Sequence, residues 1–138
     1  MRIFELMTKN VETIEADESL RVAALRMRTC NIGALPVTEG GQLVGMLTDR
    51  DITVRSTALG QHPEHTRVRE VMTTAVITCH PDATLGVAEQ LMEDKMVRRL
   101  LIVDEARNLM GILSLDDLAT VPAEVLRAGS VLEHLRHA

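Results

Sequence analysis

The segment Glu5-Leu6-Met7-Thr8 recurs as Glu70-Val71-Met72-Thr73, an offset of 65 residues from position 5 to position 70. That offset keeps like residues in phase: Val11 with Val76, Thr13 with Thr78, Asp17 with Asp82, Leu20 with Leu85, Ala23 with Ala88, Met27 with Met92, Leu35 with Leu100 and Val37 with Ile102. After one inserted residue the offset is 66, and it pairs Gly45 with Gly111, Thr48 with Ser114 and Asp51 with Asp117. Chance would not preserve so many pairs, so the chain contains a duplicated unit.

Each copy has the apolar pattern of a β-α-β-β-α unit. Leu20, Ala23, Ala24 and Met27 lie on one face of a helix, as do Leu85, Ala88 and Met92 in the second copy. The residues suited to begin these helices are Asp17 or Ser19, and Asp82 or Thr84. The expected strands are Val11–Glu15, Ala34–Thr38 and Leu43–Thr48, then Ala75–Cys79, Leu100–Asp104 and Leu109–Ser114, with closing helices near Asp49 and Leu115. The methionines fit core packing, and a soft partner-binding groove is the alternative.

The duplication predicts an α/β (α+β) fold. A copy of about 60 residues buries too little surface to be stable alone, so we expect two copies to pack sheet to sheet about a pseudo-twofold axis around one core. The expected boundaries are 1–58 for the first repeat, 59–69 for a linker, 70–121 for the second repeat and 122–138 for a helical tail. The apolar tail residues Val125, Leu126, Val131, Leu132 and Leu135 indicate a helix that packs on its own module or a dimer mate, or else docks on a partner.

Composition narrows the functional classes. The chain of 138 residues has a net charge of −5 and contains one Phe, no Tyr and no Trp. Nucleic acid is therefore not an expected partner, because both the basic footprint and the stacking platform are missing. There is no apolar signal region or membrane-length apolar run, so we expect a cytoplasmic protein that does not engage a membrane.

The cysteines and histidines carry weaker signals. Cys30 and Cys79 are far apart in the sequence, which favours reduced, buried thiols over a disulfide. His62 and His65 lie in the polar linker, and His134 and His137 lie near the C-terminus. A solvated linker and tail explain these histidines better than a metal site does.

The chemically informative motifs are Gly45-Met-Leu-Thr48-Asp-Arg-Asp51 and Gly111-Ile-Leu-Ser114-Leu-Asp-Asp117. In each, a hydroxyl residue ends a strand and a carboxylate follows three residues later on a helix. A capping box explains that spacing without any ligand. The same geometry also suits a nucleotide, because free N–H groups and the hydroxyl can meet phosphate while the carboxylate accepts from a ribose diol. Spacing alone leaves the two interpretations open.

Arg98 and Arg99 favour the ligand interpretation for the second repeat. They precede the strand expected to end near Ser114, where guanidinium groups could hold phosphate, although paired arginines are often plain surface residues. Gly33 and Ala34 take their places in the first repeat. The second repeat is therefore better equipped for an anionic ligand.

These motifs resemble those of a tandem pair of cystathionine-β-synthase (CBS) domains, a Bateman module. The resemblance runs from about Ile3 to Ala119, and its motifs include Met7-Thr8, Gly33-Ala34-Leu35-Pro36-Val37, Gly45-x-x-Thr48-x-x-Asp51, Met72-Thr73, Arg99-Leu100-Leu101-Ile102-Val103-Asp104 and Gly111-x-x-Ser114-x-x-Asp117. It implies binding of AMP, ADP, ATP, S-adenosylmethionine or NAD between the repeats, a role in energy sensing, and a homodimer. It implies no catalytic cofactor.

The resemblance also assigns roles to residues. Asp51 and Asp117 would hold ribose, and Thr48 and Ser114 would hold phosphate or ribose. Arg99 and Leu100 match the family's His-Arg-Leu phosphate stretch, with Arg98 in place of the histidine. The adenine would lie against the lead-in to the sister repeat: Thr8, Asn10, Val11 and Glu12 for the Asp117 site, and Thr73, Ala75 and Val76 for the Asp51 site. Ala34 and Leu35 would form an apolar wall beside the base. Because the Gly33-Ala34 site lacks the basic pair, its ligand would be uncharged at that end, or absent.

Three functions are weighed on this basis. The first is a nucleotide-sensing regulatory module that signals to a separate protein target, with no catalysis of its own. The second is a metal-dependent hydrolase using Asp49, Asp51, Asp116 and Asp117, which lacks a nucleophile and base at suitable spacing. The third is a dimerisation scaffold with empty clefts.

Overall fold

The computed structural model describes residues 1–126, and these form two compact units. The central unit is Glu12–Val76, and the split unit combines Met1–Val11 with the chain from Ile77 onward. These units do not follow the two repeats along the sequence. The N-terminal segment belongs to the unit that holds the second repeat, and Val68–Val76, which leads into the second repeat, belongs to the unit that holds the first.

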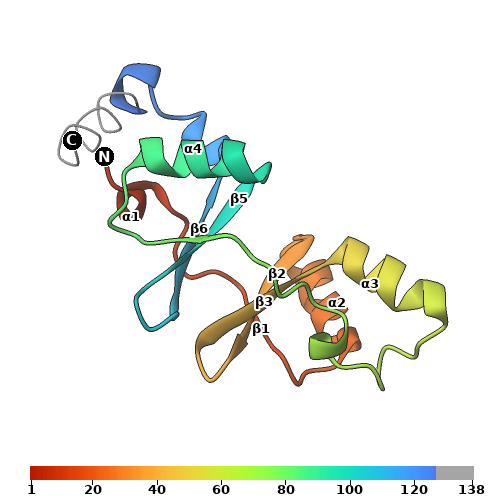
Figure 1. The fold of residues 1–138 in the computed structure, drawn as a ribbon. Coiled ribbons are helices and arrows are strands. Elements are labelled where there is room, and N and C mark those ends of the chain that lie inside the picture. Colours follow the sequence, from red (N-terminus) through yellow and green to blue (C-terminus); the bar gives the residue numbers. More distant parts are fainter. Residues whose placement is uncertain (127–138) are drawn as a thin grey trace. The chain divides into compact units, whose positions relative to one another are not determined.

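The central unit contains a sheet of order β1-β2-β3. β1 (Ile14–Glu15) pairs parallel with β2 (Ala34–Glu39), and β2 forms an antiparallel hairpin with β3 (Gln42–Thr48). Helix α2 (Leu20–Cys30) connects β1 to β2, and α3 (Asp49–Arg55) follows β3 directly (Figure 1). Two short 3-10 helices follow, η1 (Thr57–Leu59) and η2 (Val68–Glu70).

The split unit repeats this arrangement with a sheet of order β4-β5-β6. β4 (Thr78–Cys79) is parallel to β5 (Arg99–Val103), which is antiparallel to β6 (Leu109–Ser114). Helix α4 (Leu85–Lys95) packs against β5, and α5 (Leu115–Leu118) follows β6. Helix α1 (Ile3–Leu6) completes the unit (Figure 1).

The predicted β-α-β-β-α order and mixed α/β class are confirmed in both units. Of the candidate caps, the observed N-cap residues are Ser19 and Thr84, whose hydroxyls accept from the N–H groups of Val22 and Val87. The first strand of each repeat is shorter than predicted. β1 pairs with β2 only at Ile14 and Glu15, and β4 pairs with β5 only at Thr78 and Cys79. The pseudo-twofold packing and the shared core remain predictions, as do the repeat boundaries.

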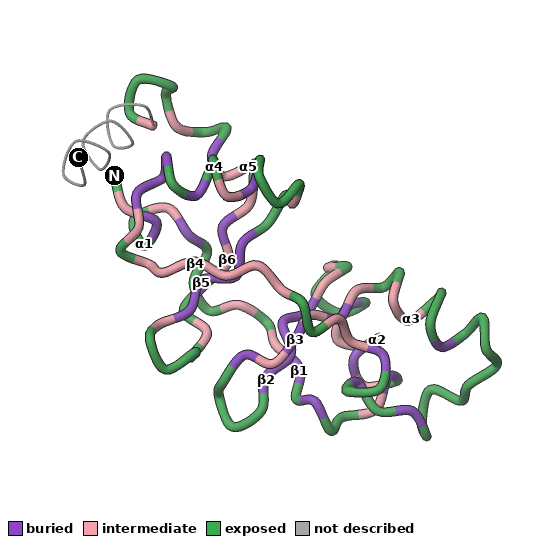
Figure 2. Tube along the Cα trace, viewed as in Figure 1, coloured by how far each residue is buried: buried purple, intermediate pink, exposed green. Residues whose placement is uncertain are grey.

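Each unit buries a core of aliphatic side chains. In the central unit Ile14, Leu20, Leu35 and Val37 are fully buried, and Met27 packs with them. The equivalent core of the split unit consists of Ile3, Leu85, Met92, Leu100, Ile102 and Leu113, among others. Figure 2 shows that buried positions are concentrated in the hairpin strands and recur within α2 and α4. The helical methionines therefore serve core packing, as expected.

The segments that lead into each repeat, residues 1–11 and 68–76, are attached by matching hydrogen bonds. Ile3 donates its backbone N–H to Ala83 at 2.9 Å, and the equivalent Val68 donates to Glu18 at 2.8 Å. Val68 and Thr66 are buried, although both fall in the segment predicted as a linker. The duplication therefore extends to the way each lead-in binds the start of the other repeat's helix.

The prediction for the cysteines is partly wrong. Both thiols are free, but Cys30 is exposed because it lies in the last turn of α2, beyond the buried Met27. Cys79 is half-buried in β4, and this burial raises the pKa of its thiol.

The predicted C-terminal helix lies mostly outside the described residues. Leu126 packs partly buried against the core of the split unit and donates its N–H to Pro122 at 3.3 Å. Val131, Leu132, Leu135, His134 and His137 lie outside the described residues.

Candidate functional site

Both candidate motifs form complete capping boxes. Thr48 Oγ1 accepts from the backbone N–H of Asp51 at 3.0 Å, and Asp51 Oδ2 accepts from the N–H of Thr48 at 3.0 Å. Ser114 and Asp117 make the same two bonds at 3.0 and 2.9 Å. Such a cap stabilises a helix by about 1 kcal/mol. In each box one carboxylate oxygen is engaged with the cap, which leaves Oδ1 to accept other donors.

In each antiparallel hairpin, the first residues of the first strand lie opposite the capping residue at the end of the second strand. Arg99 lies opposite Ser114 in the β5–β6 ladder, and Ala34 lies opposite Thr48 in the β2–β3 ladder. The backbone carbonyl of Arg98 accepts from Leu115 at 2.8 Å. The split unit therefore places the backbone of both arginines next to the Ser114–Asp117 pair. The expectation that this strand ends near Ser114 is wrong, because the hairpin is antiparallel and the end of the strand, Val103, pairs with Leu109.

The lead-in segments pair with the hairpins just before the caps. Thr8 exchanges two backbone hydrogen bonds with Ile112, at 2.8 and 3.0 Å. Thr73 does the same with Met46 in the central unit, at 2.8 and 2.9 Å. The N–H groups of both threonines are used in these bonds. A backbone N–H donated to a base would therefore come from the residues that follow, such as Asn10, Val11 and Ala75.

Gly45 and Gly111 permit this close approach. A Cβ on Gly111 would lie 2.6 Å from the carbonyl oxygen of Thr8, and one on Gly45 would lie 2.8 Å from that of Thr73. Both distances are far inside van der Waals contact, so a side chain would push the lead-in away. No role was predicted for either glycine from the sequence, although a glycine inside a strand pattern often indicates a close backbone neighbour.

Some predicted residues lie elsewhere than at a ligand-facing surface. Leu35 and Leu100 have side chains that are 0% exposed in the two cores. The Leu35 side chain therefore does not form the predicted apolar wall beside a base, and the Leu100 side chain does not face the predicted phosphate. Asn10 takes a left-handed backbone conformation with φ of 55°. Glu12 belongs to the central unit, whereas Ser114 and Asp117 belong to the split unit, and its role at that site stays a prediction.

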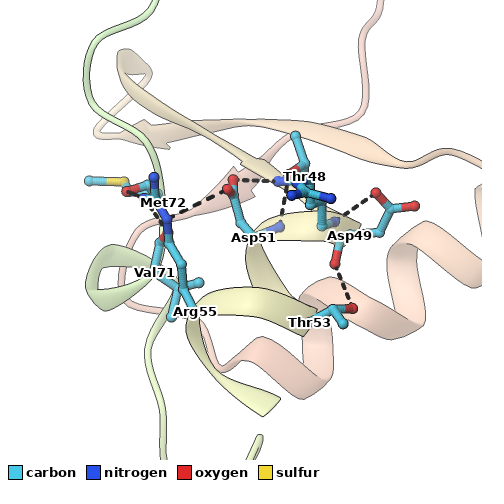
Figure 3. A network of polar contacts seen from close by, with 8 residues as sticks. Thr48, Asp49, Asp51, Thr53, Arg55, Val71 and Met72 are labelled. Atoms are coloured by element: carbon cyan, nitrogen blue, oxygen red, sulfur yellow. Dashed lines mark hydrogen bonds and ion pairs between the residues drawn. The ribbon is translucent and has the colours of Figure 1, made fainter. Parts of the chain in front are cut away.

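The central unit contains a cation at its site that the sequence analysis missed. Arg55 Nε lies 3.9 Å from Asp51 Oδ1, and Arg55 Nη1 donates to the carbonyls of Val71 at 3.3 Å and Met72 at 3.4 Å (Figure 3). This arginine bridges the candidate ribose carboxylate to the lead-in segment. Its equivalent in the second repeat is Val121, so the bridge is particular to the central unit.

These features define a class: a duplicated α/β module in which each unit joins a Ser/Thr–Asp pair, the start of a hairpin and a lead-in strand segment. The family model described as "CBS domain" matches residues 3–56 and 68–124. The chain therefore belongs to the CBS domain family, whose paired domains are regulatory modules.

The relatives agree with this assignment. The chain is 44% identical over 133 residues to the CBS domain-containing protein YhcV of Bacillus subtilis, covering 96% of this chain and 94% of that protein. It is similar to the crystal structure of Hypoxic Response Protein I with two coordinated zinc ions, with a TM-score of 0.78 and 31% identity. The match covers 88% of this chain and 100% of that one. It is also similar to the CBS domain pair of protein MJ0100 in complex with 5′-methylthioadenosine and S-adenosyl-L-methionine, with a TM-score of 0.72, 28% identity and coverage of 87% and 94%.

Residues 1–126 contain no group of three His, Cys, Asp or Glu side chains placed to hold a metal ion. Across the same residues, every helix is too short or too polar to span a bilayer.

Proposed function

We propose that this chain binds an adenosine-containing ligand and relays its occupancy to a separate protein. The ligand class comprises AMP, ADP, ATP, NAD and S-adenosylmethionine. The observation that carries the proposal is the assembly of Arg98, Arg99, Ser114 and Asp117 within one unit, beside the lead-in strand. These residues supply the cation, hydroxyl and carboxylate that a nucleotide needs.

The split unit supports a division of labour along the ligand. Arg98 and Arg99 are exposed and lie beside Ser114, so their guanidinium groups are available to a phosphate. Asp117 Oδ2 is engaged in the cap, and Oδ1 would accept from the ribose hydroxyls. Backbone groups of Asn10 and Val11 would contact the adenine, since those of Thr8 are paired with Ile112.

The central unit would carry a second site on Thr48, Asp51, Ala34, Ala75 and Val76. The ligand would favour one arrangement of the module over another by its difference in affinity for the two, and that difference sets the size of the signal. A homodimer and an unidentified target protein complete the proposal. The complex of the MJ0100 CBS pair with adenosyl compounds supports the ligand class.

A ligand-free interaction scaffold is the second candidate. The observation in its favour is that both capping boxes are fully satisfied without a ligand, so the Thr48–Asp51 and Ser114–Asp117 pairs have a structural role already. The scaffold interpretation predicts that no adenosyl compound binds.

The first test uses the composition. Because the chain has no Tyr or Trp, the purified protein absorbs little at 280 nm, and a strong band at 260 nm would reveal a retained nucleotide. Calorimetric titration with AMP, ATP, NAD and S-adenosylmethionine then measures affinity. We expect at least one of them to bind, and binding of none would leave only the scaffold.

The residue-level test is Asp117→Asn. The amide oxygen can still accept from the N–H of Ser114, so the cap is retained, while its NH₂ group can no longer accept from a ribose hydroxyl. Asp116→Asn, a neighbouring exposed carboxylate, is the matched control with the same change of charge. We expect Asp117→Asn alone to weaken binding of the nucleotide by about tenfold or more, the size of one lost hydrogen bond to a charged group. Equal affinity in the two variants would contradict the assignment of Asp117.

A further inference from the structure

The two candidate sites differ at the start of the second strand of each repeat. Arg98 and Arg99 stand there in the split unit, and Gly33 and Ala34 stand there in the central unit. The helix that follows the hairpin also differs, because it begins with Leu115 in the split unit and with Asp49 in the central unit. The two differing positions are neighbours in each unit. The N–H of Asp49 donates to the carbonyl of Gly33, and the N–H of Leu115 donates to the carbonyl of Arg98.

The Asp49 carboxylate occupies the space that a side chain at position 33 would take. A Cβ on Gly33 would lie 2.9 Å from Asp49 Oδ2, and Asp49 Oδ1 accepts from the N–H of Arg50 at 2.8 Å (Figure 3). Position 33 is the equivalent of Arg98. The central unit therefore has a carboxylate beside the position that an arginine, Arg98, occupies in the split unit.

Nearby cations do not cancel this charge at the site. Arg55 is six residues along α3 from Asp49, about 9 Å at the rise of an α-helix, and it faces Asp51 and the lead-in carbonyls instead. Arg50 is adjacent in sequence, but consecutive helical residues do not share a face. Asp49 is exposed, so its effect on a ligand depends on ionic strength.

We propose that Asp49 makes the central site selective for an adenosine ligand with a neutral or cationic 5′ substituent, while the split site takes a 5′-phosphate. Gly33 leaves room for the carboxylate, and a phosphate at this position would be repelled by it. The inference rests on the proposed function, because it names the ligand class of a site that function requires. One chain would then carry two sites that respond to different members of the adenosyl class.

The experiment weakens the split site with the Asp117→Asn substitution and reads the central site from the change that Asp49→Asn makes in this background. Affinities for 5′-methylthioadenosine, a neutral probe, and AMP, an anionic one, are measured by calorimetry with and without Asp49→Asn. We expect the background protein to bind the neutral probe at least about tenfold more tightly than AMP, a ratio equivalent to 1.4 kcal/mol. Asp49→Asn should raise the affinity for AMP and leave that for the neutral probe unchanged. Added salt should reduce the preference in the background protein only.

Each failure has its own meaning. If the wild-type protein binds neither probe nor the other adenosyl compounds, the proposed function is overturned and this inference with it. If the wild type binds AMP but the Asp117→Asn protein binds neither probe, the central site is not an adenosyl site and this inference alone is overturned. It is also overturned if Asp49→Asn leaves the ratio of the two affinities unchanged. Gly33→Arg combined with Asp49→Leu copies the split site, and we expect it to bind AMP more tightly than the neutral probe.

Discussion

Replacing Gly111 with alanine should detach the lead-in backbone from β6. The new Cβ would lie 2.6 Å from the Thr8 carbonyl oxygen and 2.8 Å from Met7 Sδ, and one of these groups must move. The methionine side chain can adjust, but the Thr8 carbonyl is backbone that is paired with Ile112. We therefore expect the two Thr8–Ile112 hydrogen bonds to lengthen or break.

The magnitude follows from these contacts. Two backbone hydrogen bonds contribute about 1 kcal/mol each. Loss of glycine flexibility in the unfolded chain offsets up to about 1 kcal/mol of that. The net expectation is a decrease of about 1–3 kcal/mol in the free energy of unfolding, which includes the strain of an overpacked contact.

Urea unfolding followed by circular dichroism measures this change, since the chain has no Trp to report by fluorescence. Hydrogen exchange at the amides of Thr8 and Ile112 tests the cause, and both should lose protection. Gly33→Ala is the matched control: its Cβ would meet only the end of the Asp49 side chain, which can rotate, so we expect a change within about 0.5 kcal/mol. Full protection of both amides in Gly111→Ala, together with unchanged stability, would refute the reasoning.

Two further predictions concern titratable groups. Hydrogen bonds from the backbone and side chain of Asn108 hold the pKa of Asp104 below its usual value. The stability that this carboxylate contributes is therefore present above the pKa of the unfolded state, and it is lost as the pH falls through the folded pKa. Asp104→Asn should accordingly lower the urea midpoint at pH 7 but not in acid below the folded pKa, and an equal loss at both pH values would contradict this. The second prediction is that Cys30, being exposed, reacts with iodoacetamide at pH 8 before Cys79, whose pKa is raised by burial. Mass spectrometry identifies the modified residue, and Cys30→Ser should abolish the fast phase; a fast phase that survives this substitution would count against the prediction.

The repeated unit and its capping motifs could be predicted from the sequence. The helical and strand periods and the Ser/Thr caps depend on neighbours within a few residues, so the pattern around Leu20, Met27 and Leu85 was sufficient to predict the β-α-β-β-α order. The Thr48–Asp51 and Ser114–Asp117 pairs were visible for the same reason, since a capping box spans three residues. The position of Arg99 opposite Ser114 was not predicted, because the expectation placed the other end of that strand there and the antiparallel register reverses it.

The tertiary structure alone decided which distant segments meet. Thr8 pairs with Ile112 and Val68 with Glu18, so each repeat receives the other's lead-in, and no local period specifies that exchange. It also removed Leu35 from the predicted apolar wall, because a strand buried on both faces leaves no exposed side for that leucine. The charge inversion at Asp49 depended on where a carboxylate lies in space against Gly33, sixteen positions earlier in the chain. Such contacts are set by the packing of whole elements, which is why repeats similar in sequence present different charges at their sites.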